Sequence, residues 1–598
     1  MKTQYKIVLF LLFIFIPFFR AKAISDKQNN FSSWDITTIP YYNNINLLNM
    51  TINKKDVEKT KNSLYQQYLE DISSRKNEMD TGLIKIDNTT MKFSMNIFGS
   101  PQKNGYPVYI ALRGGGNTDI AIADEQYEIA KINYSYPIQS GILIVPYGVT
   151  VSYDEHYRPE SFLFYDRFIQ DAIAFYNADP NRVYLLGFSS GGDGVYAIAP
   201  HTADLYAAVN MSAGYPHTWE LENLYNLPFC IQMGEYDSAY DRNTIAARYT
   251  LKLNEEQSKY GGGFPHQTFI HTQGTHNSWN DYTDMIQLVI NEEDISKWLS
   301  GSGNIKSEYK NTNAVKWLNQ YTRDPLPKNV VWNPSIYAGL RSTRAFYWLD
   351  RDGNLNDVTV IASYEPETNS VSINTIGEPD GILKVYLKPE MLDVFKDVTI
   401  KIGEKAVKVK PIVSKQIMHD TLYARGDINY MFTSEIDIQF NRQEKTITVT
   451  PVKSVTNDYD PKSYNHMFFW DSDGLFYVDQ SIFGLTFNQL ENKMPELKLQ
   501  KPEKKLALWG KNLSRTYWND ENNRNVIFMF QNGITVLVYG EYTGKLTDSF
   551  IATAEKAFGN TNHDLRCGGT CRYYLESNPY HNTDHIKQTY TYYLYEGN

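Results

Sequence analysis

The stretch VYLLGFSSGGDGVYAIAP, residues 183–200, places two serines among glycines between an apolar run and a segment that favours a helix. Residues 183–186 are short, apolar and rich in β-favouring types, which predicts a buried strand after a turn at residues 179–182. Residues 194–200 are compatible with a helix. The glycines therefore lie at a strand-to-helix turn, where a chain that doubles back leaves no space for side chains.

The spacing Gly187-x-Ser189-x-Gly191 matches the G-x-S-x-G nucleophile elbow. In such a turn the serine has a strained backbone, and its hydroxyl is exposed at the carboxyl end of the sheet. The next backbone N–H, that of Ser190, points into the same space as an oxyanion donor. Ser190 itself is the weaker nucleophile candidate, because Phe188 stands where its frame needs a glycine. The pentapeptide alone also fits a structural turn, so the surrounding pattern has to decide.

Strand and helix signals alternate from about residue 80 to about residue 300. The predicted strands are residues 108–112, 141–145, 183–186, 207–211, 229–233 and 268–271, and the predicted helices are residues 124–132, 164–176 and 243–257. Strands that alternate with helices indicate a parallel sheet covered on both faces. The sequence therefore predicts an α/β fold with a mostly parallel, doubly wound sheet of the α/β-hydrolase type.

The pattern changes after about residue 330. Short strands are predicted at residues 358–364, 370–374, 382–387, 398–402 and 446–452, with one helix at residues 415–425. Further strands are predicted at residues 506–509, 526–530 and 535–539, with a helix at residues 548–557. A chain of 598 residues is long enough for two to four domains.

These signals divide the chain into five parts. The predicted parts are a signal peptide (1–23), an N-terminal extension (24–94) with a polar helix near residues 57–76, a catalytic α/β-hydrolase domain (95–325), a β-sandwich-like domain (326–453) and a mixed α+β region of unknown role (454–598).

An acyl-transfer serine needs a histidine base, an acid that orients the base, and donors for the oxyanion. In α/β-hydrolases these residues follow the chain order Ser, acid, His. Asp237 lies in MGEYD, where the predicted strand 229–233 ends, and is the predicted acid. His276 lies in QGTHNSW, after the predicted strand 268–271, and is the predicted base.

Other acids and histidines in these segments are weaker candidates. Asp241 is the second candidate acid and Glu235 the third, and either could instead cap or orient the loop before the next helix. His271 falls within a predicted strand, which favours a packed or surface position. His266 and His217 are weaker still.

The second oxyanion donor is expected from an early strand-to-helix loop. The sequence ALRGGGN, residues 111–117, fits, because bare glycines let backbone N–H groups approach an oxyanion. The prediction assigns this role to Gly114 and Gly115, beside Ser190, without choosing between the two glycines. A flexible loop is the structural alternative. A phosphate-binding loop is disfavoured because its Gly-Lys-[Ser/Thr] ending is missing.

The amino terminus has the pattern of a signal peptide. Lys2 and Lys6 form a basic start, residues 7–19 are apolar, and residues 21–23 (AKA) fit the small-x-small cleavage rule. A membrane anchor would need a longer apolar run, of about 20 residues. We expect cleavage after Ala23, a mature chain without a membrane span, and a location in the secretory-pathway lumen or outside the cell.

The chain has three cysteines, two of which could pair in an oxidising compartment. Cys567 and Cys571 are spaced C-x3-C and could form a small-loop disulfide, whereas Cys230 lies in an apolar run and is predicted to be a buried free thiol. Two cysteines alone make a poor zinc site, so no metal is predicted, and no motif implies a cofactor.

The net charge and the N-glycosylation sequons bear on the partners and the modification of the chain. The net charge is −10 with acids and bases well mixed, and without a basic block a nucleic-acid partner is not expected. Sequons for N-glycosylation start at Asn30, Asn49, Asn88, Asn133, Asn210 and Asn512. Only an exposed sequon can carry a glycan.

Three segments carry a resemblance to a known family. GFSSGGDGVYAIAPHTADLYAAVNMSAGYPH (187–217), NLPFCIQMGEYDSAYDRN (226–243), and TRDPLPKNVVWNP with FYWLD (within 322–350) resemble secreted α/β-hydrolases of the polyhydroxybutyrate-depolymerase-like, predicted-esterase group. That group is related to the prolyl-oligopeptidase catalytic domain. ILKVYLKPEMLDVFKDVTIKIGEKAV (382–407) is similar to the group's C-terminal sandwich module. The resemblance covers about residues 95–452.

The resemblance implies the same Ser-Asp-His triad and the same glycine-rich oxyanion loop. Two departures stand out. Arg113 replaces the histidine that usually precedes the family's glycines, and residues 153–164 lack its histidine-rich stretch. The electrostatics of the site and the acyl pocket are therefore expected to differ from the family's. Residues 454–598 share no resemblance that we identify.

Three functions are consistent with the sequence. The leading expectation is a secreted serine hydrolase that cleaves a carboxylic ester, small or polymeric, through an acyl-enzyme. A serine peptidase of prolyl-oligopeptidase type is the second, although no β-propeller precedes the hydrolase domain. The third is a non-catalytic polymer-binding protein on a hydrolase scaffold, with residues 468–470 (FFW), Trp509 or Trp518 as docking aromatics. Each aromatic taken singly more often belongs to a core. The sequence gives no oligomeric state.

Overall fold

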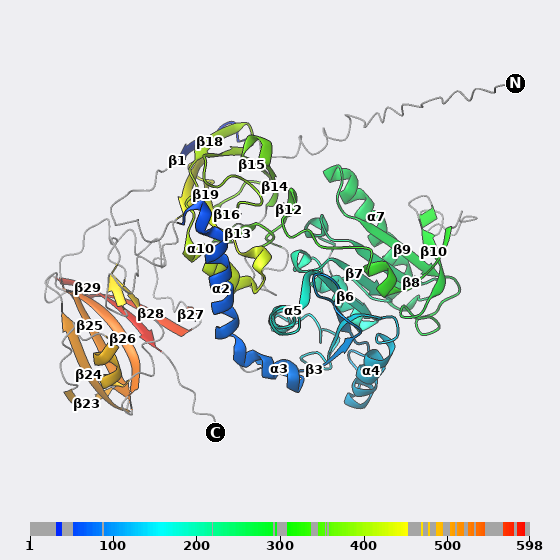
Figure 1. Ribbon diagram of the computed structural model, residues 1–598, viewed down its shortest axis with the longest axis horizontal. Coiled ribbons are helices and arrows are strands. Elements are labelled where there is room, and N and C mark those ends of the chain that lie inside the picture. The colour runs from blue at the N-terminus through cyan, green and yellow to red at the C-terminus, as the bar shows by residue number, and fades with distance from the viewer. Residues whose placement is uncertain are drawn as a thin grey trace. The chain divides into compact units, whose positions relative to one another are not determined.

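The structure is a computed structural model of the full chain. It describes residues 31–38, 52–86, 89–217, 219–290, 294–295, 308–335, 345–352, 355 and 358–452, and, beyond residue 452, shorter segments between residues 468 and 591. The chain divides into two compact units, residues 1–454 and residues 455–598 (Figure 1). The predicted signal peptide and the sequons at Asn30, Asn49 and Asn88 lie outside the described residues.

A ten-stranded mixed sheet forms one layer of the first unit, in the order β11-β10-β9-β8-β7-β6-β4-β5-β3-β2. Its strands are β2 (Leu83–Ile86), β3 (Thr89–Phe98), β4 (Tyr106–Leu112), β5 (Gly141–Pro146), β6 (Ala178–Phe188), β7 (Ala208–Ser212), β8 (Phe229–Gly234), β9 (His266–His271), β10 (Met285–Ile290) and β11 (Glu308–Thr312). The central strands β5, β4, β6, β7, β8 and β9 are parallel. The predicted α/β class is confirmed, while the antiparallel strands at the two ends of the sheet were not predicted.

Helices cover both faces of this sheet because its central strands are apolar on both sides. Along β4, Val108 and Ile110 belong to one core cluster, and Tyr109 and Ala111 belong to the other. The first cluster includes side chains of α5 (Ser161–Phe175), α6 (Ser190–Ile198) and α7 (Arg242–Tyr260), and the second includes side chains of α4 (Ile120–Asn133) and α9 (Ala314–Leu318). The sheet is therefore doubly wound.

Two five-stranded sheets follow in the chain, in the orders β1-β20-β19-β16-β13 and β12-β14-β15-β17-β18. Their strands are β1 (Asp35–Thr38), β12 (Asn329–Trp332), β13 (Leu349–Asp352), β14 (Thr359–Glu365), β15 (Ser370–Ile376), β16 (Gly381–Leu387), β17 (Val398–Ile402), β18 (Lys405–Val409), β19 (Ser434–Asn441) and β20 (Thr446–Val452). Buried side chains from both sheets, such as Ile400 and Ile438, share one core. Helix α10 has the predicted bounds, Lys415–Arg425, because Ser414 caps its start and Gly426, at φ 65°, ends it.

The described parts of residues 24–94 contribute strands to two of the larger sheets. Strand β1 pairs in parallel with β20, with Asp35 opposite Thr446, and β3 joins the ten-stranded sheet, with Phe93 opposite Pro146. Helix α2 (Val57–Asp71) packs on α10 through Tyr68 and Tyr423, whose ring centroids lie 5.2 Å apart. These N-terminal strands pair with strands that would otherwise expose unpaired edges.

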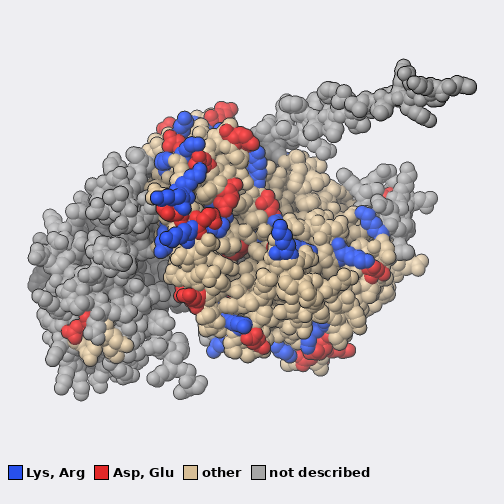
Figure 2. Space-filling view, viewed as in Figure 1, with Lys and Arg blue, Asp and Glu red and all other residues tan. Residues whose placement is uncertain are grey.

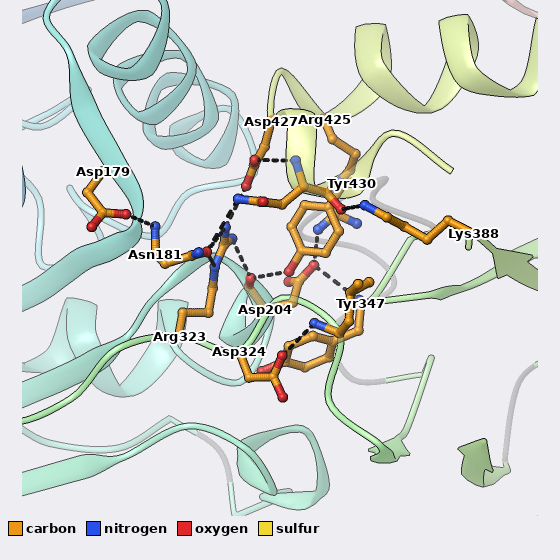
Figure 3. A network of polar contacts seen from close by, with 12 residues as sticks. Asp179, Asn181, Asp204, Arg323, Asp324, Tyr347, Lys388, Arg425, Asp427 and Tyr430 are labelled. Atoms are coloured by element: carbon orange, nitrogen blue, oxygen red, sulfur yellow. Dashed lines mark hydrogen bonds and ion pairs between the residues drawn. The ribbon is translucent and has the colours of Figure 1, made fainter. Parts of the chain in front are cut away.

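A buried polar network joins the ten-stranded sheet to the sandwich (Figure 3). The Arg323 side chain is 3 % exposed, and its Nη2 lies 2.5 Å from Asp427 Oδ2. The same guanidinium donates to Asp204 O at 3.0 Å and to Asn181 Oδ1 at 3.2 Å from Nε. Asn181 lies in the predicted turn before the elbow strand, which the structure shows as an irregularity within β6.

The second unit contains a seven-stranded antiparallel sheet in the order β23-β24-β25-β26-β29-β28-β27. The strands of this sheet are β23 (Glu503–Leu508), β24 (Lys511–Asn519), β25 (Arg524–Gln531), β26 (Ile534–Thr543), β27 (Arg566–Cys567), β28 (Gly569–Asn578) and β29 (Thr583–Thr591). The same unit also contains a two-stranded sheet, β21 (Phe468–Trp470) and β22 (Phe476–Val478), and the helix α11 (Phe487–Lys493). The predicted helix at residues 548–557 and Trp509 lie outside the described residues. So do the side chains of Cys567, Cys571, Trp518 and residues 468–470. The disulfide and the polymer-docking aromatics therefore stay predictions.

Figure 2 shows the charged side chains of one face of the first unit. Lys and Arg lie interspersed with Asp and Glu over the two five-stranded sheets, while much of the layer of the ten-stranded sheet is uncharged in this view. Within the described ranges, each helix is either too short or too polar to cross a bilayer.

Candidate active site

Ser189 lies at the sharp turn between β6 and α6, at the carboxyl ends of the parallel strands. Its backbone has φ 58° and ψ −122°, a conformation that L-residues rarely adopt. A hydrogen bond from Ser189 N to Ser212 O, 3.0 Å long, ties the turn to the end of β7. The side chain is half-buried, so a substrate can reach the hydroxyl.

The flanking glycines are required by close backbone packing. A Cβ on Gly187 would lie 2.4 Å from Gly191 O, and a Cβ on Gly191 would lie 2.2 Å from Leu112 O. Gly192 has the same restriction, with Ser212 O at 2.4 Å. The start of α6 thus packs directly on the ends of β4 and β7, as expected for a nucleophile elbow.

The structure brings the three predicted catalytic side chains together. His276 Nε2 lies 2.9 Å from Ser189 Oγ, and His276 Nδ1 lies 2.7 Å from Asp237 Oδ2. Asp237 follows β8 and is 2 % exposed, while His276 lies in the loop after β9 with its side chain 26 % exposed. A serine, an imidazole and a buried carboxylate in this chain of hydrogen bonds can activate the hydroxyl as a nucleophile.

The weaker candidate acids have other positions. Asp241 precedes α7 at φ 56°, and Glu235 Oε2 accepts a hydrogen bond from Gln273 N at 2.7 Å. Glu235 therefore supports the loop that carries His276 rather than the imidazole itself.

The weaker candidate histidines also have other partners. His271 stacks on Trp279 with ring centroids 3.8 Å apart, and its Nε2 lies 3.2 Å from Gln232 Oε1. His266 donates from Nδ1 to a backbone carbonyl, and His217 bonds to the Tyr157 hydroxyl at 2.7 Å.

The loop that carries His276 is anchored by hydrogen bonds to the buried carboxylate of Asp281. Asp281 Oδ2 accepts hydrogen bonds from Ser212 Oγ at 2.6 Å and from Tyr134 OH at 3.2 Å. Burial raises the pKa of Asp281 to about 6, and the hydrogen bond from Ser212 opposes that rise. Asn210 also donates to Asp281 and is fully buried, so the sequon at Asn210 is inaccessible in the folded chain.

Two backbone groups lie beside the nucleophile and are the candidate oxyanion donors. Ser190 is the first residue of α6, and the first N–H groups of a helix have no partner inside it. On the loop side, a Cβ on Gly114 would lie 3.4 Å from Ser189 Cβ. Gly115, at φ 84°, instead faces Gln126, whose Cγ would lie 2.8 Å from an added Cβ. The geometry favours Gly114 over Gly115 as the second donor.

Arg113, the residue before the glycines, is fully buried behind this loop. It donates from Nη1 to Gly114 O at 2.9 Å and from Nε to Tyr147 O at 2.7 Å, and its Nη2 lies 2.7 Å from Glu155 Oε2. Its charge is thus paired with a carboxylate, and the guanidinium holds the backbone of the glycine loop.

Glu155 and His156 are residues that the sequence analysis did not select. Both are fully buried, and His156 Nε2 donates to Arg113 O at 2.9 Å. Burial lowers the pKa of His156 to about 3, so the ring is neutral. Burial also raises the pKa of Glu155 to about 7, which the Arg113 guanidinium opposes. The only available signal in the sequence was that these residues follow the strand predicted at residues 141–145.

The strand order, the elbow and the chain order Ser-Asp-His are those of an α/β-hydrolase. No family model matches the chain, and no curated protein matches it. Among solved structures, a thermostable esterase is 16 % identical with a TM-score of 0.29, over 41 % of this chain and 64 % of that chain. This chain thus spans less than two thirds of that esterase's length.

Two further solved structures are similar over part of the chain. Esterase PE8 is 13 % identical with a TM-score of 0.24, over 32 % of this chain and 93 % of that chain. A putative dipeptidyl aminopeptidase IV from Bacteroides ovatus is 13 % identical with a TM-score of 0.25, over 40 % of this chain and 35 % of that chain. Likenesses at these scores leave substrate and activity open.

Proposed function

We propose that this chain is a serine hydrolase that cleaves a carboxylic ester through an acyl-enzyme on Ser189. The observation that carries the proposal is the unbroken chain of hydrogen bonds from Ser189 Oγ through His276 to Asp237, at 2.9 Å and 2.7 Å. The strained elbow supports it, because strain of this kind persists at functional sites.

In the first half of the reaction, His276 Nε2 takes the proton of Ser189 Oγ while the oxygen attacks the ester carbonyl carbon. Asp237 stabilises the imidazolium that forms. The N–H groups of Ser190 and Gly114 hold the negative charge on the carbonyl oxygen. The carbon–oxygen bond to the alcohol then breaks, and the alcohol leaves with the proton from His276.

In the second half, water replaces the alcohol. His276 takes a proton from the water, whose oxygen attacks the acyl carbon of the acyl-enzyme. The bond to Ser189 Oγ breaks, and the serine recovers its proton from His276. The free carboxylic acid then leaves, and no group outside the chain is needed for the balance of atoms.

The finer features of the proposal come from the sequence. The resemblance of residues 187–217 to the polyhydroxybutyrate-depolymerase-like group supports an ester substrate, small or polymeric. The signal-peptide pattern of residues 1–23 supports action after export, and sequencing the amino terminus of the exported protein checks the expected cleavage after Ala23.

Covalent labelling tests the proposal directly. We expect a fluorophosphonate probe to label the folded protein, because an activated serine hydroxyl attacks its phosphorus, and we expect Ser189→Ala to remove the label. Mass spectrometry of the labelled peptide should place the adduct on Ser189 rather than on Ser190. Heat-unfolded protein is the matched control. Labelling of Ser189→Ala at the wild-type rate, or no labelling of the folded wild type, would contradict the proposal.

The preference for esters over amides is a separate prediction. We expect p-nitrophenyl butyrate to be hydrolysed with a kcat/KM about 10²-fold above that for aminoacyl p-nitroanilides, since an amine leaving group depends far more on general-acid protonation. Steady-state assays on one preparation measure both values. Faster turnover of the anilides would instead identify a peptidase.

A further inference from the structure

The two sides of the oxyanion hole are joined by one buried carboxylate. Ser190 Oγ donates to Glu155 Oε1 at 3.0 Å, and Glu155 Oε2 pairs with Arg113 Nη2 at 2.7 Å. Ser190 follows the nucleophile on the elbow, whereas Arg113 precedes the glycine loop. Glu155 therefore contacts both elements that supply the donors.

The same contacts hold the glycine loop at three backbone atoms. Gly116 N donates to Ser190 Oγ at 2.8 Å, Arg113 Nη1 donates to Gly114 O at 2.9 Å, and His156 Nε2 donates to Arg113 O at 2.9 Å. The Gly116 N–H is already used by the Ser190 hydroxyl, and of the two candidate glycines it is Gly114 that lies beside the nucleophile. The spacing of Gly114 from the Ser190 N–H then depends on this set of bonds.

The burial of these groups argues for a positional role. Glu155 and Arg113 are both fully buried, and a buried ion pair is a poor source of stability because its desolvation offsets its attraction. What the buried pair can provide is a fixed position for the groups that it holds, here the Ser190 hydroxyl and the Arg113 guanidinium. Donors of an oxyanion hole act through fixed distances to the developing charge, so a small displacement is costly.

We propose that Glu155 is a positioning residue that sets the spacing between the Ser190 and Gly114 N–H groups by holding the Ser190 hydroxyl and the Arg113 guanidinium. This inference rests on the proposed function of the Ser189 site. Glu155 does not touch the substrate. It acts through the residues on either side of the hole.

Two single variants each break one arm of this link. Ser190→Ala removes the hydroxyl but keeps the backbone N–H. Glu155→Gln replaces two acceptor oxygens by one oxygen and one NH₂, so the side chain can no longer accept from both Arg113 and Ser190. We expect each variant to lower kcat for p-nitrophenyl butyrate about 10- to 100-fold, less than the loss of a whole donor, with KM within about twofold of wild type. The double variant should be little worse than the poorer single variant, because both break the same link.

A transition-state mimic separates positioning from general stability. A trifluoromethyl ketone adds Ser189 Oγ to its carbonyl and places an oxyanion in the hole, so its Ki should rise in parallel with the fall in kcat/KM. Ser152→Ala is the matched control. Ser152 lies in the same loop as Glu155, but its hydroxyl contacts Thr150 and Asp154 rather than Glu155 or Arg113. It should keep the wild-type kcat and Ki.

The outcomes distinguish this inference from the proposed function. If the wild type turns over ester while Ser190→Ala and Glu155→Gln keep kcat and Ki within twofold, Glu155 does not position the hole. The same holds if Ser152→Ala loses as much activity as Ser190→Ala. If Glu155→Gln does not fold, Ser190→Ala alone decides. A folded wild type that neither labels nor turns over would overturn the proposed function, and this inference with it.

Discussion

Asp237→Asn is expected to lower kcat for ester hydrolysis by about 10⁴-fold while the fold is kept. Asp237 Oδ2 accepts a hydrogen bond from the protonated Nδ1 of His276 at 2.7 Å. The other ring nitrogen, Nε2, is then free to accept a hydrogen bond from Ser189 Oγ at 2.9 Å. An asparagine can turn its NH₂ toward Nδ1, which moves the imidazole proton to the wrong nitrogen. Steady-state kinetics with p-nitrophenyl butyrate measure the loss, and circular dichroism checks the fold.

Two neighbouring carboxylates provide matched controls for this result. Asp241→Asn and Glu235→Gln remove a charge from the same loop, but neither side chain contacts His276 in the described structure. We expect both variants to keep kcat within about threefold of wild type. A large loss in Asp241→Asn together with an active Asp237→Asn would show that the orienting acid is Asp241.

Arg323→Met is expected to lower the free energy of unfolding by about 3–5 kcal/mol. The side chain is 3 % exposed, and it joins Asp427 before the sandwich helix η8 (Ile428–Tyr430) to Asn181 in β6 and to the Asp204 carbonyl (Figure 3). Methionine fills much of the volume but leaves the Asp427 carboxylate buried without its cation, which is the expensive outcome. Urea unfolding followed by fluorescence measures the change.

An exposed ion pair gives the comparison for Arg323. Lys328 Nζ lies 2.7 Å from Glu365 Oε2, and these side chains are 51 % and 41 % exposed. Lys328→Met should change the free energy of unfolding by less than about 1 kcal/mol, because surface pairs contribute little. Equal effects of the two substitutions would mean that the Arg323 network does not stabilise the first unit.

The catalytic candidates were accessible from the sequence because their signals are local. Gly187 and Gly191 stand at the two positions where the elbow leaves no room for a Cβ, at 2.4 Å and 2.2 Å from backbone oxygens. Asp237 follows the buried strand β8 and His276 follows β9, most of which is buried, and parallel strands end at one edge of a sheet. Residues that follow these strands in the sequence are therefore expected to lie close together in the fold.

The edge strands were missed for the opposite reason. In β3, one strand in from the edge, the apolar residues Met91, Phe93 and Met95 alternate with polar ones, which is the pattern of a half-buried strand, but nothing in this segment indicates that it pairs with β5 and β2. Strand β1 is short and mostly exposed, and nothing nearby in the sequence indicates that Asp35 pairs with Thr446. Partners of edge strands are set by where free edges lie, which a single segment does not record.

By itself, the sequence determined the α/β class, the turn at Ser189 and the candidate acid and base, because buried strands and tight glycine turns are local signals and the candidates follow from their order along the chain. Only the tertiary structure decided that Gly114 faces the nucleophile, that Arg113 and Glu155 pair behind it, and that Arg323 meets Asp427 across the fold. Buried charges must find partners wherever packing brings them, and that choice depends on contacts far apart in the chain.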